Sequence, residues 1–188
     1  MNKIGMFFGT ETGTTRLIAK KLHKLIGDEN AAKPINVNRI NAEDFMQYDA
    51  YILGTPSYGV GDIPGLSAGC LERNWEEFLD VLGRQDLSGK CCAFYGLGAQ
   101  ERYSERFASS LIALYRVFES MGATMIGDWS TDGYTFESSA SVVDGRFVGL
   151  VIDQRTQSME TATRLEQWTQ QVVPELLAHI QKVSQHAA

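Results

Sequence analysis

The chain has 188 residues, 44% of them hydrophobic, and this length supports one domain over residues 1–188 with a substantial core. The formal net charge of −6 disfavours binding to nucleic acid or to an anionic membrane, and no apolar run is long enough to span a bilayer. We therefore expect a cytoplasmic monomer without a membrane segment, whose partners are proteins with basic surfaces.

Short apolar runs alternate with helical patterns along the chain. Strands are expected at residues 4–8, 34–39, 50–54, 91–95 and 125–126. Helices are expected after the first strand, around Ile18, Leu22 and Leu25, and at residues 75–82, 107–118 and 165–183. Residues 128–144 are polar and turn-like before strand character resumes at residues 147–152, which indicates an insertion that divides the last strand. Such alternation predicts a parallel sheet with helices on both faces.

The three cysteines cannot form an even set of disulfides, so we expect free thiols. Cys91 and Cys92 are adjacent in an expected strand and should therefore point to opposite faces of the sheet. Cys70 lies in a glycine-rich loop, and we expect it to be the thiol that is open to oxidation in air.

The most informative segment is the loop between the first strand and the first helix. It consists of Thr10, Glu11, Thr12, Gly13, Thr14 and Thr15. A helix start leaves backbone N–H groups without internal partners, and these donors, the helix dipole and nearby threonine hydroxyls can together bind a phosphate. The loop matches neither the P-loop pattern nor the Gly-x-Gly-x-x-Gly fingerprint, which disfavours a Walker-type or NAD site. A threonine-rich helix cap without a ligand is the alternative.

Two further polar loops follow the strands at residues 50–54 and 91–95, and each carries a tyrosine among glycines. These tyrosines are Tyr58 and Tyr103. Ligands of parallel α/β sheets bind outside the carboxyl ends of the strands, where the three loops should meet. Two tyrosines beside a phosphate site can hold a flat aromatic ring between them, which points to FMN. A loop tyrosine that only packs on the surface is the alternative.

Several segments together resemble the long-chain flavodoxins, most closely the branch associated with nitrogen fixation. The segments are residues 10–15, 52–56, 61–66, 75–78, 96–98, 129–134 and 147–150. The resemblance implies a flavodoxin-like three-layer α/β sandwich, with five parallel strands ordered 2-1-3-4-5 and the last strand interrupted by an insertion. It also implies noncovalent FMN and one-electron transfer at low potential, with no catalytic residue and no metal.

The resemblance also implies a role for individual residues. Residues 10–15 would bind the phosphate, and the ribityl chain would be met by Thr55, Pro56, Ser57 and Asp153. Tyr58 matches the inner and Tyr103 the outer residue that stacks on the flavin ring. The pyrimidine edge would face the backbone of Leu97, Gly98, Ala99 and Gln100. The peptide between Gly59 and Val60 is expected to turn over on reduction, bringing the Gly59 carbonyl toward flavin N5–H.

Four positions depart from the residues that are common in such relatives. They are Ala99 in place of aspartate, Thr14 in place of lysine, Arg106 in place of asparagine, and Arg155 in place of an acidic or neutral residue. The negative charge lost at Ala99 and the positive charges of Arg102, Arg106 and Arg155 near the proposed ring would stabilise the fully reduced, anionic flavin, so we expect a less reducing second reduction step than in more acidic relatives. The rival interpretation is that the arginines are solvated and screened. The docking face is expected to consist of Asp62, Glu72, Glu76, Glu77, Asp132 and Glu137.

The resemblance predicts a carrier that takes electrons from a reductase and passes them to an iron–sulfur or flavin protein, with nitrogenase reductase as a candidate acceptor. The alternative is an FMN-dependent quinone or NAD(P)H oxidoreductase of the same fold, against which Tyr103 argues because it would cover the ring. A receiver domain needs acids after the first strand and an aspartate that ends the third. Gly9, Thr10, Gly54 and Thr55 occupy those places, so this class is excluded.

Overall fold

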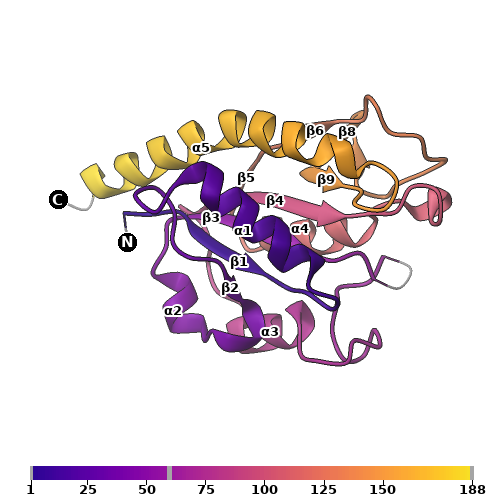
Figure 1. Cartoon of the computed structure of the whole chain (residues 1–188). Coiled ribbons are helices and arrows are strands. Elements are labelled where there is room, and N and C mark those ends of the chain that lie inside the picture. Colours follow the sequence, from indigo (N-terminus) through magenta and orange to yellow (C-terminus); the bar gives the residue numbers. More distant parts are fainter. Residues whose placement is uncertain (1, 59–60, 187–188) are drawn as a thin grey trace.

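The computed structural model describes residues 2–58 and 61–186 (Figure 1). Its strands are β1 (Gly5–Phe8), β2 (Ile35–Asn36), β3 (Ala50–Thr55), β4 (Cys91–Leu97), β5 (Thr124–Ile126), β6 (Trp129–Ser130), β7 (Val142–Val143), β8 (Arg146–Phe147) and β9 (Leu150–Ile152). Its helices are α1 (Thr14–Ile26), α2 (Ala42–Met46), α3 (Trp75–Leu82), α4 (Ser110–Ser120) and α5 (Thr161–His186). None of these helices is both long enough and apolar enough to cross a bilayer.

The main sheet is parallel and has the order β2-β1-β3-β4-β5, which confirms the predicted fold class. Strand β4 pairs with two short strands in turn. Its first half pairs with β5, beginning at Cys91 opposite Thr124, and its second half pairs with β9, ending at Leu97 opposite Ile152. The fifth strand position is therefore shared by β5 and β9, and the chain between them leaves the sheet as an insertion.

The insertion ends later than the sequence predicted. Phe147 was expected to resume the fifth strand, but it lies in β8 and pairs antiparallel with Trp129 of β6 and Val142 of β7 in a small second sheet. The chain rejoins the main sheet only after Gly149. A Cβ atom on Gly149 would lie 2.4 Å from the carbonyl oxygen of Phe94, so the close passage beside β4 requires glycine.

Strand β2 is shorter than the predicted strand at residues 34–39. Only Ile35 and Asn36 pair with β1. The Asn36 side chain accepts a hydrogen bond from the N–H of Asn38 at 3.2 Å, and a 3₁₀ turn follows at Val37–Arg39. The asparagine side chain competes with the sheet for backbone hydrogen bonds, which the alternation of Ile35 and Val37 did not reveal.

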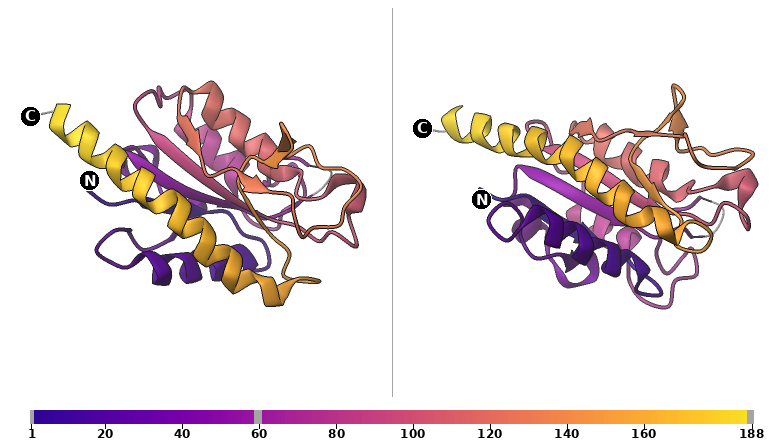
Figure 2. Two further views of the ribbon diagram at one scale, coloured as in Figure 1. Left: turned by 90° about the horizontal axis from the view of Figure 1, so that it is seen from above. Right: turned by 45° about the horizontal axis from the view of Figure 1, so that its top comes forward.

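Helices cover both faces of the sheet (Figures 1 and 2). Helices α1 and α5 lie side by side on one face and bury Leu22 and Trp168 there, in the cluster that also contains Cys91. Helices α2, α3 and α4 cover the other face, where Phe118 belongs to the cluster that contains Cys92. The two adjacent cysteines therefore point to opposite faces, as predicted.

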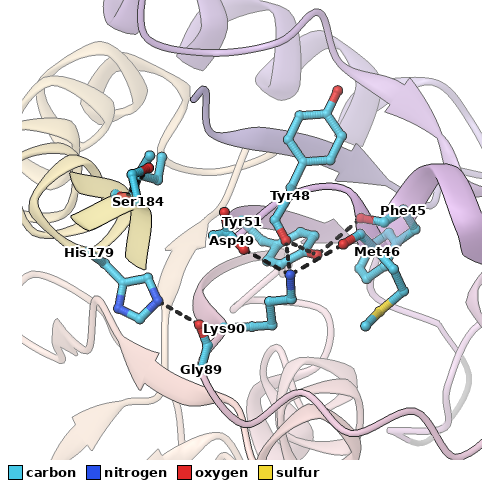
Figure 3. A network of polar contacts seen from close by, with 10 residues as sticks. Phe45, Met46, Tyr48, Asp49, Tyr51, Gly89, Lys90, His179 and Ser184 are labelled. Carbon is cyan, nitrogen blue, oxygen red and sulfur yellow. Dashed lines mark hydrogen bonds and ion pairs between the residues drawn. The ribbon is translucent and has the colours of Figure 1, made fainter. Parts of the chain in front are cut away.

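A polar network closes the amino-terminal end of strands β3 and β4 (Figure 3). Lys90 Nζ donates to the carbonyl oxygens of Met46 at 3.2 Å and Tyr48 at 2.6 Å, and it forms an ion pair with Asp49 at 2.9 Å. Tyr51 donates its hydroxyl hydrogen to the same Tyr48 carbonyl at 2.7 Å. Lys90 thus satisfies carbonyl groups at and just beyond the end of α2 and ties α2 to the start of β4. The candidate site lies at the opposite, carboxyl-terminal edge of the sheet.

Candidate cofactor-binding site

Helix α1 begins without a side-chain cap and without an acidic residue in its first turn. Its N-cap residue, Gly13, has a φ of 89°, a left-handed conformation that glycine adopts at little cost. The N–H of Gly13 donates to Thr10 Oγ1 at 3.0 Å, which folds the loop back on itself. The first N–H groups of α1 have no partner within the helix, so they are available to an anion.

The hydroxyl group of Thr15 is buried beside this helix start. Thr15 is 1% exposed, and its Oγ1 atom has no hydrogen-bond partner among the residues that the structure describes. A buried hydroxyl in this state costs about 1–3 kcal/mol, and buried polar groups are normally satisfied. An anion held by the start of α1 would accept this hydrogen bond. The residues present therefore fit a phosphate group.

A cavity of about 260 Å³ opens beside the loop. The loop contributes Glu11, Thr12 and Thr14, and the segment after β3 contributes Pro56, Ser57 and Tyr58. The end of β4 and the segment after it contribute Leu97, Gly98, Ala99, Arg102 and Tyr103, and the end of β9 and the residues after it contribute Ile152, Gln154 and Arg155. The three loops predicted to meet do surround one cavity, and a fourth segment completes its wall.

Among the predicted residues that the structure describes, six do not line this cavity: Thr10, Gly13, Thr15, Thr55, Gln100 and Asp153. Thr10 and Gly13 instead line a neighbouring cavity of about 570 Å³, which shares Glu11 and Thr12 with the first. The Thr55 side chain is buried, and its hydroxyl donates to the carbonyl oxygen of Pro56 at 3.2 Å. The predicted roles of Gly59 and Val60 lie outside the described residues.

Asp153 is fully buried and joins two segments of the cavity wall. Its Oδ2 atom accepts hydrogen bonds from the N–H of Gln100 at 2.9 Å and from the hydroxyl of Thr156 at 2.6 Å. Its Oδ1 atom accepts from the N–H groups of Arg155 and Thr156. Burial alone would raise the pKa of Asp153, but these hydrogen bonds outweigh it and hold the pKa below its ordinary value. The carboxylate therefore ties the end of β9 to the loop after β4.

The two tyrosines are held by different contacts. Tyr58 exchanges two hydrogen bonds with Ser110 Oγ, which accepts from the Tyr58 N–H at 3.2 Å and donates to the Tyr58 carbonyl at 3.0 Å. The half-buried ring of Tyr103 lies near two guanidinium groups, whose carbons are 5.3 Å (Arg102) and 5.6 Å (Arg106) from the ring centroid. These distances suit cation–π contacts. Arg102 and Arg106 thus lie beside Tyr103, the residue predicted to stack on the outer face of the flavin ring.

Sequence reasoning missed three residues of the site. Ile152 and Gln154 line the cavity, and Ser110 holds Tyr58. The polar run at residues 153–156, directly after an apolar strand, was a signal that could have found Gln154, because ligands bind at the carboxyl ends of such strands. Ser110 had no such signal, since its partner lies 52 positions away.

Two of the acids predicted for the docking face bind the backbone at the start of α3 and in the loop before it. Glu77 forms a capping box with Asn74 at the start of α3 and also accepts from the N–H of Leu66 at 2.8 Å. Partial burial raises the pKa of Glu77, but these N–H donors hold it below its ordinary value. Glu76 accepts from the N–H of Ser67 at 3.1 Å. The other four predicted acids are exposed: Asp62, Glu72, Asp132 and Glu137.

Cys70 does not have the exposure that its glycine-rich loop suggested. The residue is 5% exposed, and burial, with a contribution from Glu11, raises the pKa of its thiol to about 11. The reactive form of cysteine is the thiolate, so the structure opposes the expected oxidation in air.

The sheet, the uncapped helix start and the cavity between two tyrosines define an α/β protein with a site for a flat, phosphorylated ligand. A family model described as Flavodoxin matches residues 6–168. A flavodoxin of Klebsiella pneumoniae is 45% identical over 172 residues, which cover 92% of this chain and 97% of that protein. One of Enterobacter agglomerans is 40% identical over 178 residues, covering 94% and 100%. The chain therefore belongs to the flavodoxin family.

A solved structure supports the same assignment. The crystal structure of Fusobacterium nucleatum flavodoxin bound to flavin mononucleotide has a TM-score of 0.81 to this chain at 29% identity, and the match covers 93% of this chain and 98% of that one.

Proposed function

We propose that this chain binds FMN noncovalently and carries single electrons between proteins at low potential. The observation that carries the proposal is the buried, unpartnered hydroxyl of Thr15 at the start of α1, beside a cavity with Tyr58 and Tyr103 in its wall. A phosphate accounts for the hydroxyl, and the two rings account for a flat partner. Membership of a family of electron-transfer proteins supports the same function.

Different residues of the site would bind different parts of FMN. The N–H groups at the start of α1 and the hydroxyls of Thr12, Thr14 and Thr15 would hold the phosphate. Tyr58 and Tyr103 would exclude water from the two faces of the ring. FMN, when bound, supplies the ability to take up and release electrons one at a time. Exclusion of water and a net charge of −6 disfavour added negative charge at the site, which supports a low potential.

We infer that the partners are a reductase that donates electrons and an iron–sulfur or flavin protein that accepts them. The negative charge and the exposed acids Asp62, Glu72, Asp132 and Glu137 support docking to basic surfaces. The resemblance of the sequence to the nitrogen-fixation branch supports nitrogenase reductase as the acceptor. The monomeric state and the location in the cytoplasm stay predictions. Electron transfer to such a partner should slow as salt is added.

The test is a titration of the purified protein with FMN, followed by stepwise reduction with dithionite in the absence of oxygen. We expect FMN fluorescence to be quenched on binding, and the absorbance spectra to show two separate one-electron steps. A folded protein that takes up no FMN would contradict the proposal. Reduction in a single two-electron step, together with turnover of NADPH and a quinone without any other protein, would support the oxidoreductase alternative.

A further inference from the structure

The insertion forms a series of hydrogen bonds with the segment that carries Tyr103. The residues of the insertion that make these bonds do not line the candidate cofactor cavity. Residues 135–141, which we call the serine strip, run along residues 100–112. The side-chain bonds between the two segments join positions 29 to 35 residues apart in the chain. Contacts of this kind restrict the conformation of the Tyr103 segment from outside the sheet.

One end of the serine strip holds the residues on either side of Tyr103. The N–H of Thr135 donates to Gln100 Oε1 at 2.9 Å. The N–H groups of Glu137 and Ser138 both donate to the carbonyl oxygen of Ser104 at 3.0 Å. The backbone of Tyr103 is thereby bracketed by two attachments to the insertion.

The other end of the serine strip holds a strained residue. Ala108 has a φ of 50°, in the left-handed region that residues with a Cβ atom rarely adopt, and it is 2% exposed. Ser139 Oγ donates to the carbonyl oxygen of Phe107 at 2.5 Å, and Ser141 Oγ donates to that of Ala108 at 2.7 Å. Strained conformations persist only where the surrounding structure holds them, and here two hydroxyls of the insertion hold the two carbonyls.

The segment from Gln100 to Ser110, which the serine strip holds, also contacts the part of the site that carries Tyr58. It continues into α4, where Ser110 exchanges hydrogen bonds with the backbone of Tyr58. A further cavity of about 260 Å³ lies between the two walls and has Tyr58, Tyr103 and Ser110 in its lining. The conformation of residue 108 therefore bears on the placement of both tyrosines.

We propose that the serine strip is a clamp, in which Ser139 and Ser141 hold Ala108 in its left-handed conformation and so position Tyr103 for the cofactor. The inference rests on the proposed function and deepens it. Ser139 and Ser141 are positioning residues, since neither lines the cavity. Without their hydroxyls, Ala108 relaxes toward ordinary backbone angles, and the segment from Gln100 to Ser110 leaves the geometry that fits the flavin.

The first experiment needs no cofactor. Arg102 and Arg106 are exposed trypsin sites within the clamped segment, so the rate of cleavage after them reports its opening. In the full chain that carries both Ser139→Ala and Ser141→Ala, we expect this cleavage to speed up by about tenfold, since opening limits it. Cleavage after Lys20, on α1, should not change.

A matched control is Ser120→Ala, which removes another hydroxyl bonded to a backbone carbonyl, at the end of α4. This variant should be cleaved like the wild type. Unchanged cleavage after both arginines in the double variant would overturn the clamp. An equal rise after Lys20 would also overturn it, because the loss would then be global.

The second experiment measures FMN binding by fluorescence quenching. We expect the Ser139→Ala, Ser141→Ala double variant to bind FMN about tenfold more weakly, because the Tyr103 segment must be ordered at the moment of binding. Adding Ala108→Gly should restore most of the affinity, since glycine adopts a positive φ without the clamp. Equal affinity of wild type and double variant, or no restoration by glycine, would overturn the inference. If the wild type binds no FMN, the proposed function fails, while the cleavage rates still decide the clamp.

Discussion

The hydroxyl of Thr15 allows a test in which two measured quantities move in opposite directions. In Thr15→Val a methyl group replaces the hydroxyl with almost no change of shape. The hydroxyl is buried and has no partner among the described residues, so its removal takes away a desolvated polar group. We therefore expect the protein without FMN to become more stable, and its affinity for FMN to fall.

The magnitudes follow from the burial of this group. An unsatisfied buried hydroxyl costs about 1–3 kcal/mol, so the free energy of unfolding without FMN should rise by up to that amount. A hydrogen bond to a charged group contributes about 1.5–3 kcal/mol, so loss of the bond to the phosphate should raise the FMN dissociation constant by about 10- to 150-fold.

The assays are urea unfolding of the protein without FMN and fluorescence titration with FMN. Thr15→Ser is the matched control, because it keeps the hydroxyl and loses the buried methyl group. It should lose about 1 kcal/mol of stability and keep most of the affinity. The reasoning is refuted if Thr15→Val binds FMN within about twofold of the wild type, because the loss of a hydrogen bond to the phosphate should weaken binding by much more than that.

Three further predictions concern charges. Arg102→Gln should make the potential of the second reduction step more negative by roughly 10–40 mV, the effect of an exposed charge, and Ala99→Asp should shift it in the same direction by at least as much, because Ala99 is buried; spectroelectrochemistry measures both, and unchanged potentials would mean that the charges are screened. Lys90→Met removes the ion-pair partner of Asp49 and one hydrogen-bond donor from each of two carbonyl oxygens, and it should lower the free energy of unfolding in urea by about 1–3 kcal/mol, whereas the exposed Lys33→Met should change it hardly at all. The pKa of Asp153 is lowered in the folded state, so its stabilising effect is present above its ordinary pKa of about 4 and is lost as pH falls through the folded pKa. Asp153→Asn should therefore be less stable than the wild type at pH 7 and lose less stability between about pH 4 and pH 2.

The fold could be predicted because its signals are local. Apolar runs such as the one that ends at Phe8 mark buried strands, and the polar composition of residues 128–144 marks a segment outside the sheet. The errors arose where a local pattern had a competitor. Ile35 and Val37 alternate like a strand, but the Asn36 side chain starts a turn between them. Phe147 is apolar like a strand residue of the main sheet, but it pairs within the insertion.

The loop at residues 10–15 could likewise be singled out from its own residues as the candidate phosphate site, whereas the residues that support the candidate ring site could not. Asp153 directly follows strand β9 and was assigned to the ribityl chain by the family resemblance, but its carboxylate is directed at the N–H of Gln100, 53 positions away. Ser110 and Ser141 are ordinary serines in the sequence. Their roles depend on which backbone groups the fold brings within reach, and sequence patterns carry no information on such pairings.

Tyr103 is placed mainly by contacts that its neighbours make. Asp153 holds the N–H of Gln100 on one side of it, and the insertion holds Ser104 and the strained Ala108 on the other. The ring itself contacts two exposed arginine side chains at the surface. Replacing Tyr103 would therefore remove a contact with the flavin and leave the loop in place, whereas removing the clamp would move the loop and leave the ring intact. On this proposal the insertion is part of the binding site although, within the described residues, none of it lines the cavity beside the loop at residues 10–15.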